Sequence, residues 1–174
     1  SRVVALCVTA LFAASGSALA AQPLIAIDPG HGGADSGAVG ILPDGTQTGL
    51  TPRFDADGRT AIYEKDVTLD VAQRVNAFLQ ARGYPTLMTR TQDLAGGDVP
   101  FTTTGADLRA RVDLANNAGA RLFVSIHENA LAPTTTGTET FHFYYASAGS
   151  RALAHLVHLE VLKALGLPDR GVKT

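Results

Sequence analysis

The sequence has no tryptophan and only one cysteine among its 174 residues. Because that cysteine, Cys7, lies in an apolar N-terminal stretch, residues 21–174 can form neither a disulfide nor a thiol nucleophile. Lysine and arginine total 14 against 16 acidic residues, so the chain also lacks the positive charge that nucleic-acid-binding domains carry. We therefore expect no disulfide framework, no cysteine-dependent catalysis and no nucleic-acid partner.

Residues 1–20 differ in composition from the rest of the chain. Arg2 precedes an apolar run over 3–14, and the tripeptide ALA at 18–20 has the spacing of a cleavage site. The run is shorter than the roughly 20 residues of a membrane-spanning helix. This layout predicts a secretory signal peptide over 1–20, the alternative being a buried first helix. We expect an exported protein of the periplasm, cell wall or extracellular space, with no membrane span after cleavage.

Residues 21–174 are predicted to form one domain, which we expect to be a monomer. Hydrophobic residues make up 45% of the sequence and charged residues 17%, a composition that supports a packed core. Residues 29–63 are rich in Gly, Pro, Thr and Asp and predict a long loop. Sequence periodicity predicts strands at 24–28, 84–89, 121–127 and 138–145, and helices at 66–82, 106–117 and 151–165.

Strands that alternate with helices are typical of an α/β fold. We expect a single open, mostly parallel twisted sheet with helices on both faces. Helical spacing also predicts which side chains face the core: Val67, Val71, Val75, Phe78 and Leu79; Leu108, Val112 and Ala115; Leu153, Val157 and Val161.

Two predicted strands lead directly to a histidine, His31 after LIAIDPG and His127 after LFVSI. Glu64 precedes the first predicted helix, and all three positions belong to the sheet edge where ligands of open α/β folds bind. Two imidazoles and one carboxylate are a ligand set of catalytic zinc sites. We therefore predict Zn²⁺ at His31, Glu64 and His127. The alternative is two hydrogen-bonded structural histidines and a carboxylate that stabilises a helix N-terminus.

Metal-bound histidines usually donate their second ring N–H to a nearby acceptor. Asp28 and Asn129 lie close in sequence to the two predicted ligands and are the expected acceptors. The other three histidines, His142, His155 and His158, have no predicted role. His155 and His158 lie three residues apart on a predicted helix and are expected at the surface, the alternative being that they pair.

Six segments together carry a family resemblance: IAIDPGHGGADSGAVG, YEKDVTLDVAQRVNAFLQARGY, LMTRTQD, LRARVDLANNAGARLFVSIHENA, GTETFHFYY and LGLPDRGVKT. In this order they resemble the zinc-dependent N-acetylmuramoyl-L-alanine amidases, the cell-wall hydrolases called amidase-3. The resemblance spans residues 24–174 and implies that His31, Glu64 and His127 are the zinc ligands. It also implies hydrolysis of the amide between N-acetylmuramic acid and L-alanine of peptidoglycan.

The catalytic base of this family is a glutamate in a later segment that resembles VELGF. No glutamate follows Glu160 here, so the resemblance implies a sheet that is incomplete at the C-terminus and a base beyond Thr174, or a lost base. Glu128 is a weaker candidate. Strand alternation points its side chain away from the metal, unless the strand ends earlier and lets the side chain turn back.

Two other functions fit the same residues. A zinc-containing module that binds peptidoglycan without cleaving it would need no base. A zinc peptidase or deacetylase would act on another exported substrate. For the amidase we expect peptidoglycan as the partner. The segment after GTETFHFYY leaves no room for a regulatory insertion, so regulation would lie in a missing C-terminal part or come from an activator protein.

Overall fold

The computed structural model describes residues 22–43, 46–128 and 136–174. The predicted signal peptide and Asn129 therefore lie outside the described residues. The chain divides into two compact units, Ser1–Glu128 and Asn129–Thr174. Within the described ranges, no helix is long and apolar enough to cross a membrane.

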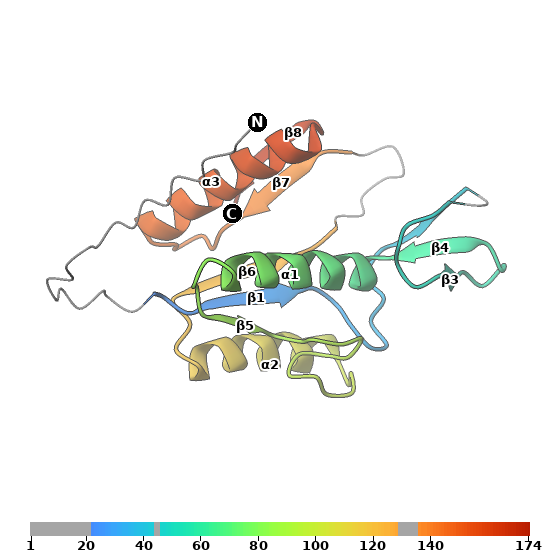
Figure 1. Cartoon of the computed structure of the whole chain (residues 1–174), viewed down its shortest axis with the longest axis horizontal. Helices are drawn as coiled ribbons and strands as arrows, with labels where there is room; N and C mark the ends of the chain where they lie inside the picture. Colours follow the sequence, from blue (N-terminus) through green and yellow to red (C-terminus); the bar gives the residue numbers. More distant parts are fainter. Residues whose placement is uncertain (1–21, 44–45, 129–135) are drawn as a thin grey trace, which may run out of the picture. The chain divides into compact units, whose positions relative to one another are not determined.

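A parallel three-stranded sheet forms the centre of the first unit (Figure 1). Strand β1, Ile25–Pro29, is buried along its whole length, and it lies between β5, Thr86–Met88, and β6, Leu122–Ile126. Parallel neighbours on both sides require apolar residues on both faces, which explains why IAI does not alternate with polar residues. Ile25 and Ile27 form the core together with Ala72 of the first helix.

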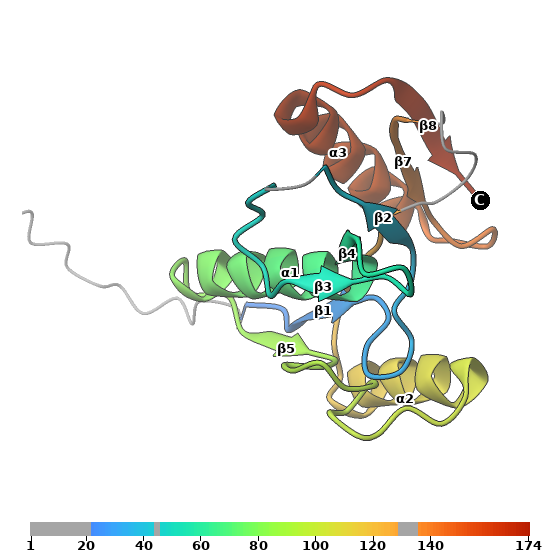
Figure 2. The same ribbon diagram turned by 90° about the vertical axis from the view of Figure 1, so that its right-hand side faces the viewer.

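Two helices cover opposite faces of this sheet: α1, Glu64–Gln80, and α2, Thr104–Asn117 (Figures 1 and 2). The expected inner face of α1 is partly wrong, since Val71, Val75 and Phe78 are exposed. The helix packs instead through fully buried Thr68 and Ala72, whose small side chains allow a close approach to the sheet. Thr68 Oγ1 donates to the Gly30 carbonyl at 2.8 Å, so this polar residue is satisfied in the core.

The inner face of α2 also differs from the expectation. Leu108 and Val112 are exposed, whereas Asp107, Arg111 and Ala115 are buried. The reason is an ion pair: Arg111 Nε donates to Asp107 Oδ2 at 2.9 Å, and the guanidinium then reaches β1. A paired and hydrogen-bonded charge can occupy a core position that hydrophobic periodicity assigns to an apolar residue.

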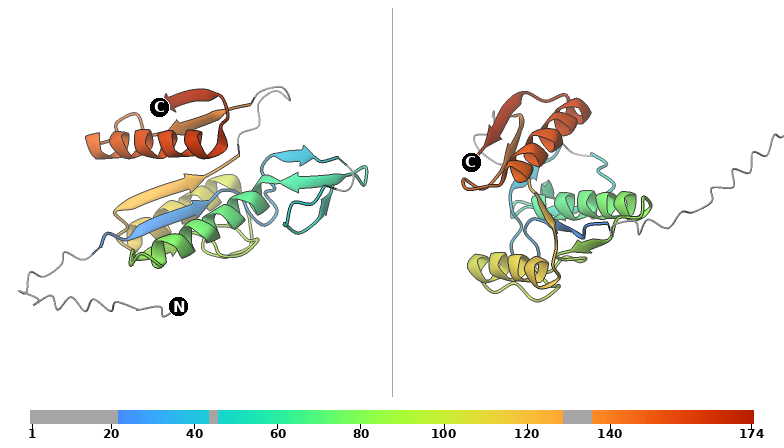
Figure 3. Two further views of the ribbon diagram at one scale, coloured as in Figure 1. Left: turned by 45° about the horizontal axis from the view of Figure 1, so that its top comes forward. Right: turned by 90° about the vertical axis from the view of Figure 1, so that its left-hand side faces the viewer.

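The predicted long loop over 29–63 is wrong, because part of it is a small antiparallel sheet (Figure 3). Its strands are β2, Val39–Ile41, β3, Arg53–Phe54, and β4, Thr60–Tyr63, in the order β2-β4-β3. The connections between these strands are too short for the crossover that parallel pairing needs, so the strands pair antiparallel. They form a sheet that is separate from the parallel sheet. Arg53 anchors it through ion pairs to Asp66 and Asp93.

Asp93 makes stability depend on pH. Desolvation by itself would raise the pKa of Asp93, but hydrogen bonds from Lys65, Arg53 and the Gly33 amide lower it below its usual value. A lowered pKa in the folded state stabilises the protein above the unfolded value of about 3.9, and this contribution is lost as pH falls further. We expect Asp93→Asn to lower stability at pH 7 by at most about 1 kcal/mol, because the side chain is partly exposed.

The difference between wild type and Asp93→Asn should shrink in urea unfolding at pH 3. Asp113→Asn, at an exposed position of α2, is the matched control. A difference of equal size at pH 7 and pH 3 would contradict the role of the Asp93 charge.

The second unit pairs β7, Thr138–Phe141, in parallel with β8, Asp169–Lys173. They are connected by α3, Ala148–Leu165, which crosses over between them (Figure 2). Ser147 caps the helix by accepting from the Ser150 amide at 3.1 Å, and Gly166 ends it in the left-handed conformation with φ 63°. The α/β class is confirmed, with parallel strands in a three-stranded sheet of the first unit and a two-stranded sheet of the second.

His158 corrects one of the surface predictions. Its side chain is buried on α3, where Nδ1 lies 3.2 Å from Thr140 Oγ1 and Nε2 lies 2.9 Å from Asp169 Oδ1. These contacts tie α3 to both strands of the unit, so His158 is a structural residue. His155, one helical turn earlier, is exposed as predicted.

Candidate metal centre

The pairing of β1 with β6 brings two histidines to one edge of the sheet. Pro29 is the register partner of Ile126, and the Gly30 amide extends the ladder by donating to the Ile126 carbonyl at 3.0 Å. His31 and His127 therefore leave the sheet side by side. Glu64 is the first residue of α1 and reaches the same place from above the sheet.

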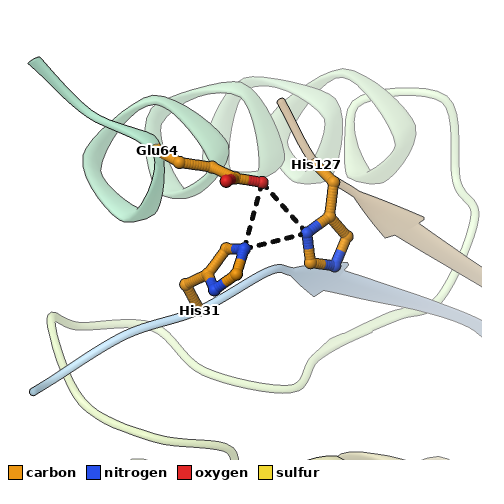
Figure 4. A group of neighbouring side chains, drawn as sticks. All are labelled: His31, Glu64 and His127. Carbon is orange, nitrogen blue, oxygen red and sulfur yellow. Dashed lines mark hydrogen bonds and ion pairs between the residues drawn. The ribbon is translucent and has the colours of Figure 1, made fainter. Parts of the chain in front are cut away.

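The three predicted ligands converge (Figure 4). Oε1 of Glu64 lies 3.1 Å from His31 Nε2 and 3.0 Å from His127 Nδ1, and the two ring nitrogens lie 3.2 Å apart. A tetrahedral zinc ion with bonds of about 2.0–2.2 Å needs donor atoms roughly 3.3–3.6 Å apart. The triangle is slightly smaller than this, so small rotations of the side chains would fit the ion. Within the described ranges, no other His, Cys, Asp and Glu side chains form such a group.

The site holds Glu64 in its charged form. Burial by itself would raise the pKa of Glu64, but hydrogen bonds with His127 and with the Ala38 and Glu128 amides lower it to about 2. The hydrogen bond with Glu64 raises the pKa of His127 in turn, against the effect of desolvation. A buried, ionised carboxylate beside two imidazoles is a set of donors suited to a divalent cation.

The hydrogen-bond partner of His31 is Asp35, which the sequence analysis missed. Asp35 Oδ2 lies 3.0 Å from His31 Nδ1, and Oδ1 accepts from the Gly37 amide at 3.1 Å. This bond turns Nε2 of His31 toward the other two donors, as a carboxylate does when it accepts the free ring N–H of a metal-bound histidine. A carboxylate four residues after a histidine in a glycine-rich loop is the signal that could have identified it.

The prediction that Asp28 orients an imidazole is wrong. Both of its oxygens are occupied elsewhere: Oδ1 accepts from Thr89 Oγ1 and from Arg111 Nη1, and Oδ2 accepts from Ser125 Oγ at 2.6 Å. As a residue of β1 with its side chain in the core, Asp28 lies before the turn that carries His31. The other predicted partner, Asn129, lies outside the described residues.

Two glycines leave the space that the donors occupy. A Cβ at Gly30 would lie 2.3 Å from Cε1 of His127, and a Cβ at Gly37 would lie 2.6 Å from Cδ2 of His31. Gly37 also has φ +62°, in the left-handed region. Gly30 and Gly37 are therefore required by close packing around the donors.

Glu128 contributes its main chain to the site. Because β6 ends at Ile126, strand alternation no longer fixes the direction of the Glu128 side chain, which is exposed. Its amide donates to Glu64 Oε1 at 2.7 Å. Partial desolvation and the charge of Glu64 raise the pKa of the Glu128 carboxyl.

Comparisons with known proteins identify the family of this chain. Residues 25–174 match the family model of N-acetylmuramoyl-L-alanine amidases. The amidase LytC of Bacillus subtilis is 37% identical over 152 residues, which are 86% of this chain and 25% of LytC. The germination-specific amidase of the same organism is 36% identical over 155 residues, 86% of this chain and 57% of that protein. This chain thus spans a quarter to a little over half of these relatives.

A solved structure is similar as well. The amidase AmiC2 of Nostoc punctiforme superposes with a TM-score of 0.61 at 30% sequence identity, covering 87% of this chain and 68% of AmiC2. The similarity extends across both units, since it includes more residues than the first unit contains.

Proposed function

This chain belongs to the N-acetylmuramoyl-L-alanine amidase family, and we propose that it hydrolyses the amide between N-acetylmuramic acid and L-alanine of peptidoglycan with zinc as cofactor. The observation that carries the proposal is the convergence of His31 Nε2, His127 Nδ1 and Glu64 Oε1 within 3.2 Å of one another. Their chemistry matches a catalytic site with three protein ligands and one open position.

Bound zinc would polarise the scissile carbonyl and lower the pKa of a coordinated water to about 7. The residues of this chain would bind the ion and fix the directions of its ligands. Glu64 brings one negative charge, which offsets half the charge of the ion. Asp35 fixes the direction of the His31 ring, and Gly30 and Gly37 keep side chains away from the donors.

The acid–base group of the reaction is proposed from the family resemblance, in which it is a glutamate of a later segment that resembles VELGF. Glu128 is the exposed carboxylate next to the donors, and it stays the weaker candidate. Asp35 is a poor candidate for this role, because hydrogen bonds from His31 and Gly37 already engage both of its oxygens.

Digestion of purified murein tests the proposal. We expect new L-alanine amino termini and intact glycan strands. Activity should disappear after zinc is removed with a chelator and return when zinc is added. New sugar reducing ends, or cleavage between amino acids, would contradict an amidase. Cleavage of a different exported substrate would favour the zinc peptidase or deacetylase, and binding to murein without any product would favour the non-catalytic module.

We also propose that the protein acts outside the cytoplasm, on peptidoglycan and with an activator protein. The composition of residues 1–20 and the family of cell-wall hydrolases support export to the periplasm or cell wall. Fractionation of cells that express the full gene, with N-terminal sequencing of the exported product, would test cleavage before Ala21.

A further inference from the structure

Arg111 connects α2 to the turn that carries His31. The Arg111 side chain is 2% exposed, and its three nitrogens donate four hydrogen bonds. Nη2 donates to the His31 carbonyl at 2.5 Å. Nη1 donates to the Pro29 carbonyl and to Asp28 Oδ1, each at 2.7 Å, and Nε donates to Asp107 Oδ2 at 2.9 Å.

The backbone conformation of the turn is uncommon at His31 itself. β1 ends at Pro29 and the Gly30 amide makes the last hydrogen bond to β6, so the sheet no longer holds the backbone of His31. His31 has φ 60°, a left-handed conformation that is uncommon for a residue with a side chain, and it lies between two glycines with no strong preference of their own. The direction of the His31 peptide sets where its ring can point. A hydrogen bond to the His31 carbonyl therefore fixes the peptide and, through it, the position of Nε2.

A second buried arginine supports the same turn from another side. Arg90 donates from Nε to the Pro29 carbonyl at 3.0 Å and from Nη2 to the Gly30 carbonyl at 2.9 Å. Together the two guanidiniums bind the carbonyls of three consecutive residues. Of these two arginines, Arg111 is the one that reaches the carbonyl of His31.

We propose that Arg111 is a positioning residue for the metal centre: it holds the His31 main chain in the conformation that directs Nε2 toward the other two donors. This inference rests on the proposed function, because it assumes that the three donors bind zinc. The four acceptors of Arg111 include none of the three donor atoms, so its effect passes through the backbone of His31.

The chemistry of the side chain makes the inference testable. A guanidinium presents five N–H donors in a planar fork, whereas a lysine ammonium presents three donors on one atom. In Arg111→Lys the positive charge between Asp28 and Asp107 remains, but one nitrogen cannot reach acceptors on both sides and the His31 carbonyl. The variant thus keeps the buried positive charge of Arg111 and removes its hydrogen bond to the His31 carbonyl, so the two effects can be measured apart.

Zinc affinity, measured by competition with a chromogenic chelator, is the first readout. We expect Arg111→Lys to bind zinc about 10–100-fold more weakly, the usual effect of losing an outer-shell partner. The visible spectrum of the cobalt-substituted protein should change with it, because altered donor geometry changes the absorption. Arg109→Lys, the same exchange at an exposed position of α2, should match wild type in both.

A purely structural role is tested with Ala115→Gly, which weakens α2 at a buried position without touching the turn. We expect it to lower thermal stability and leave zinc affinity and the cobalt spectrum unchanged. If folded Arg111→Lys has the zinc affinity and the cobalt spectrum of the wild type, the inference about Arg111 is wrong, but the proposed function is unaffected. A wild-type protein that takes up no zinc would overturn the proposed function and the inference with it.

If Arg111→Lys does not fold, a measurement on the wild-type protein tests the inference instead. The Nε–H signal of Arg111 should shift in its nitrogen-15 NMR spectrum when one equivalent of zinc is added, while that of Arg109 stays in place. An Arg111 signal that does not respond to zinc would overturn the inference.

Discussion

Replacing His127 with alanine is expected to abolish tight zinc binding and murein hydrolysis while leaving the fold intact. His127 Nδ1 is one of three converging donors, 3.0 Å from Glu64 Oε1 and 3.2 Å from His31 Nε2. Loss of an outer-shell partner costs about 10–100-fold in affinity or activity, so loss of a direct ligand should cost more than about 10²-fold. The side chain is 44% exposed and follows the end of β6, so its removal leaves no large cavity.

Zinc content after dialysis and product release from murein measure the effect, and circular dichroism checks the fold. The matched control is His155→Ala, which removes an exposed imidazole from α3 and should leave zinc content and activity unchanged. Full zinc content in folded His127→Ala would refute the assignment of this donor. Loss of zinc in both variants would point to a nonspecific effect of removing histidine.

Replacing Asp28 with alanine is expected to cause the largest loss of stability. Asp28 is buried and accepts from Thr89, Ser125 and Arg111. Its removal leaves two hydroxyls without their acceptor and takes away one of the two carboxylates that pair with the buried Arg111. Breaking a buried pair by removing one partner costs about 3–5 kcal/mol, enough to unfold many domains of this size.

Urea unfolding, followed by circular dichroism, measures the change in midpoint. The matched control is Asp70→Ala, which breaks the exposed ion pair with Arg74 on α1 and should cost about 0–1 kcal/mol. Equal midpoints for Asp28→Ala and Asp70→Ala would mean that the buried network contributes no more than a surface ion pair. Asp28→Ala should also weaken zinc binding, because Arg111 would lose one of the acceptors that fix its position next to the His31 carbonyl.

The ligand positions could be predicted because strand ends are a local property. An apolar run that breaks into glycine and histidine marks the carboxyl end of a strand, and parallel strands place those ends on one edge. His31, Glu64 and His127 therefore follow from periodicity and topology alone, and the structure brings them together as expected. That they bind zinc stays a prediction, as does the signal peptide over 1–20.

Contacts made through the core could not be predicted in this way. Hydrophobic periodicity assigned Leu108 and Val112 to the inner face of α2, but Arg111 is buried there, because its acceptors come from residues about 80 positions earlier in the chain. The partners of Asp28 could not be predicted either. Its place in the sequence suggests a bond to His31, but its partners Thr89, Arg111 and Ser125 are distant in the chain.

The sequence by itself determined the α/β class, the strands β1, β5, β6 and β7, the three helices and the three candidate ligands, because each depends on residue spacing along one element. Only the tertiary structure decided which side chains orient those ligands. Asp35 supports the His31 ring and Arg111 holds the His31 carbonyl, whereas Asp28 binds Arg111 and two hydroxyls. Hydrogen bonds depend on distance and direction to within a few tenths of an ångström, and residues far apart in sequence reach those positions only when the sheet and its helices have packed.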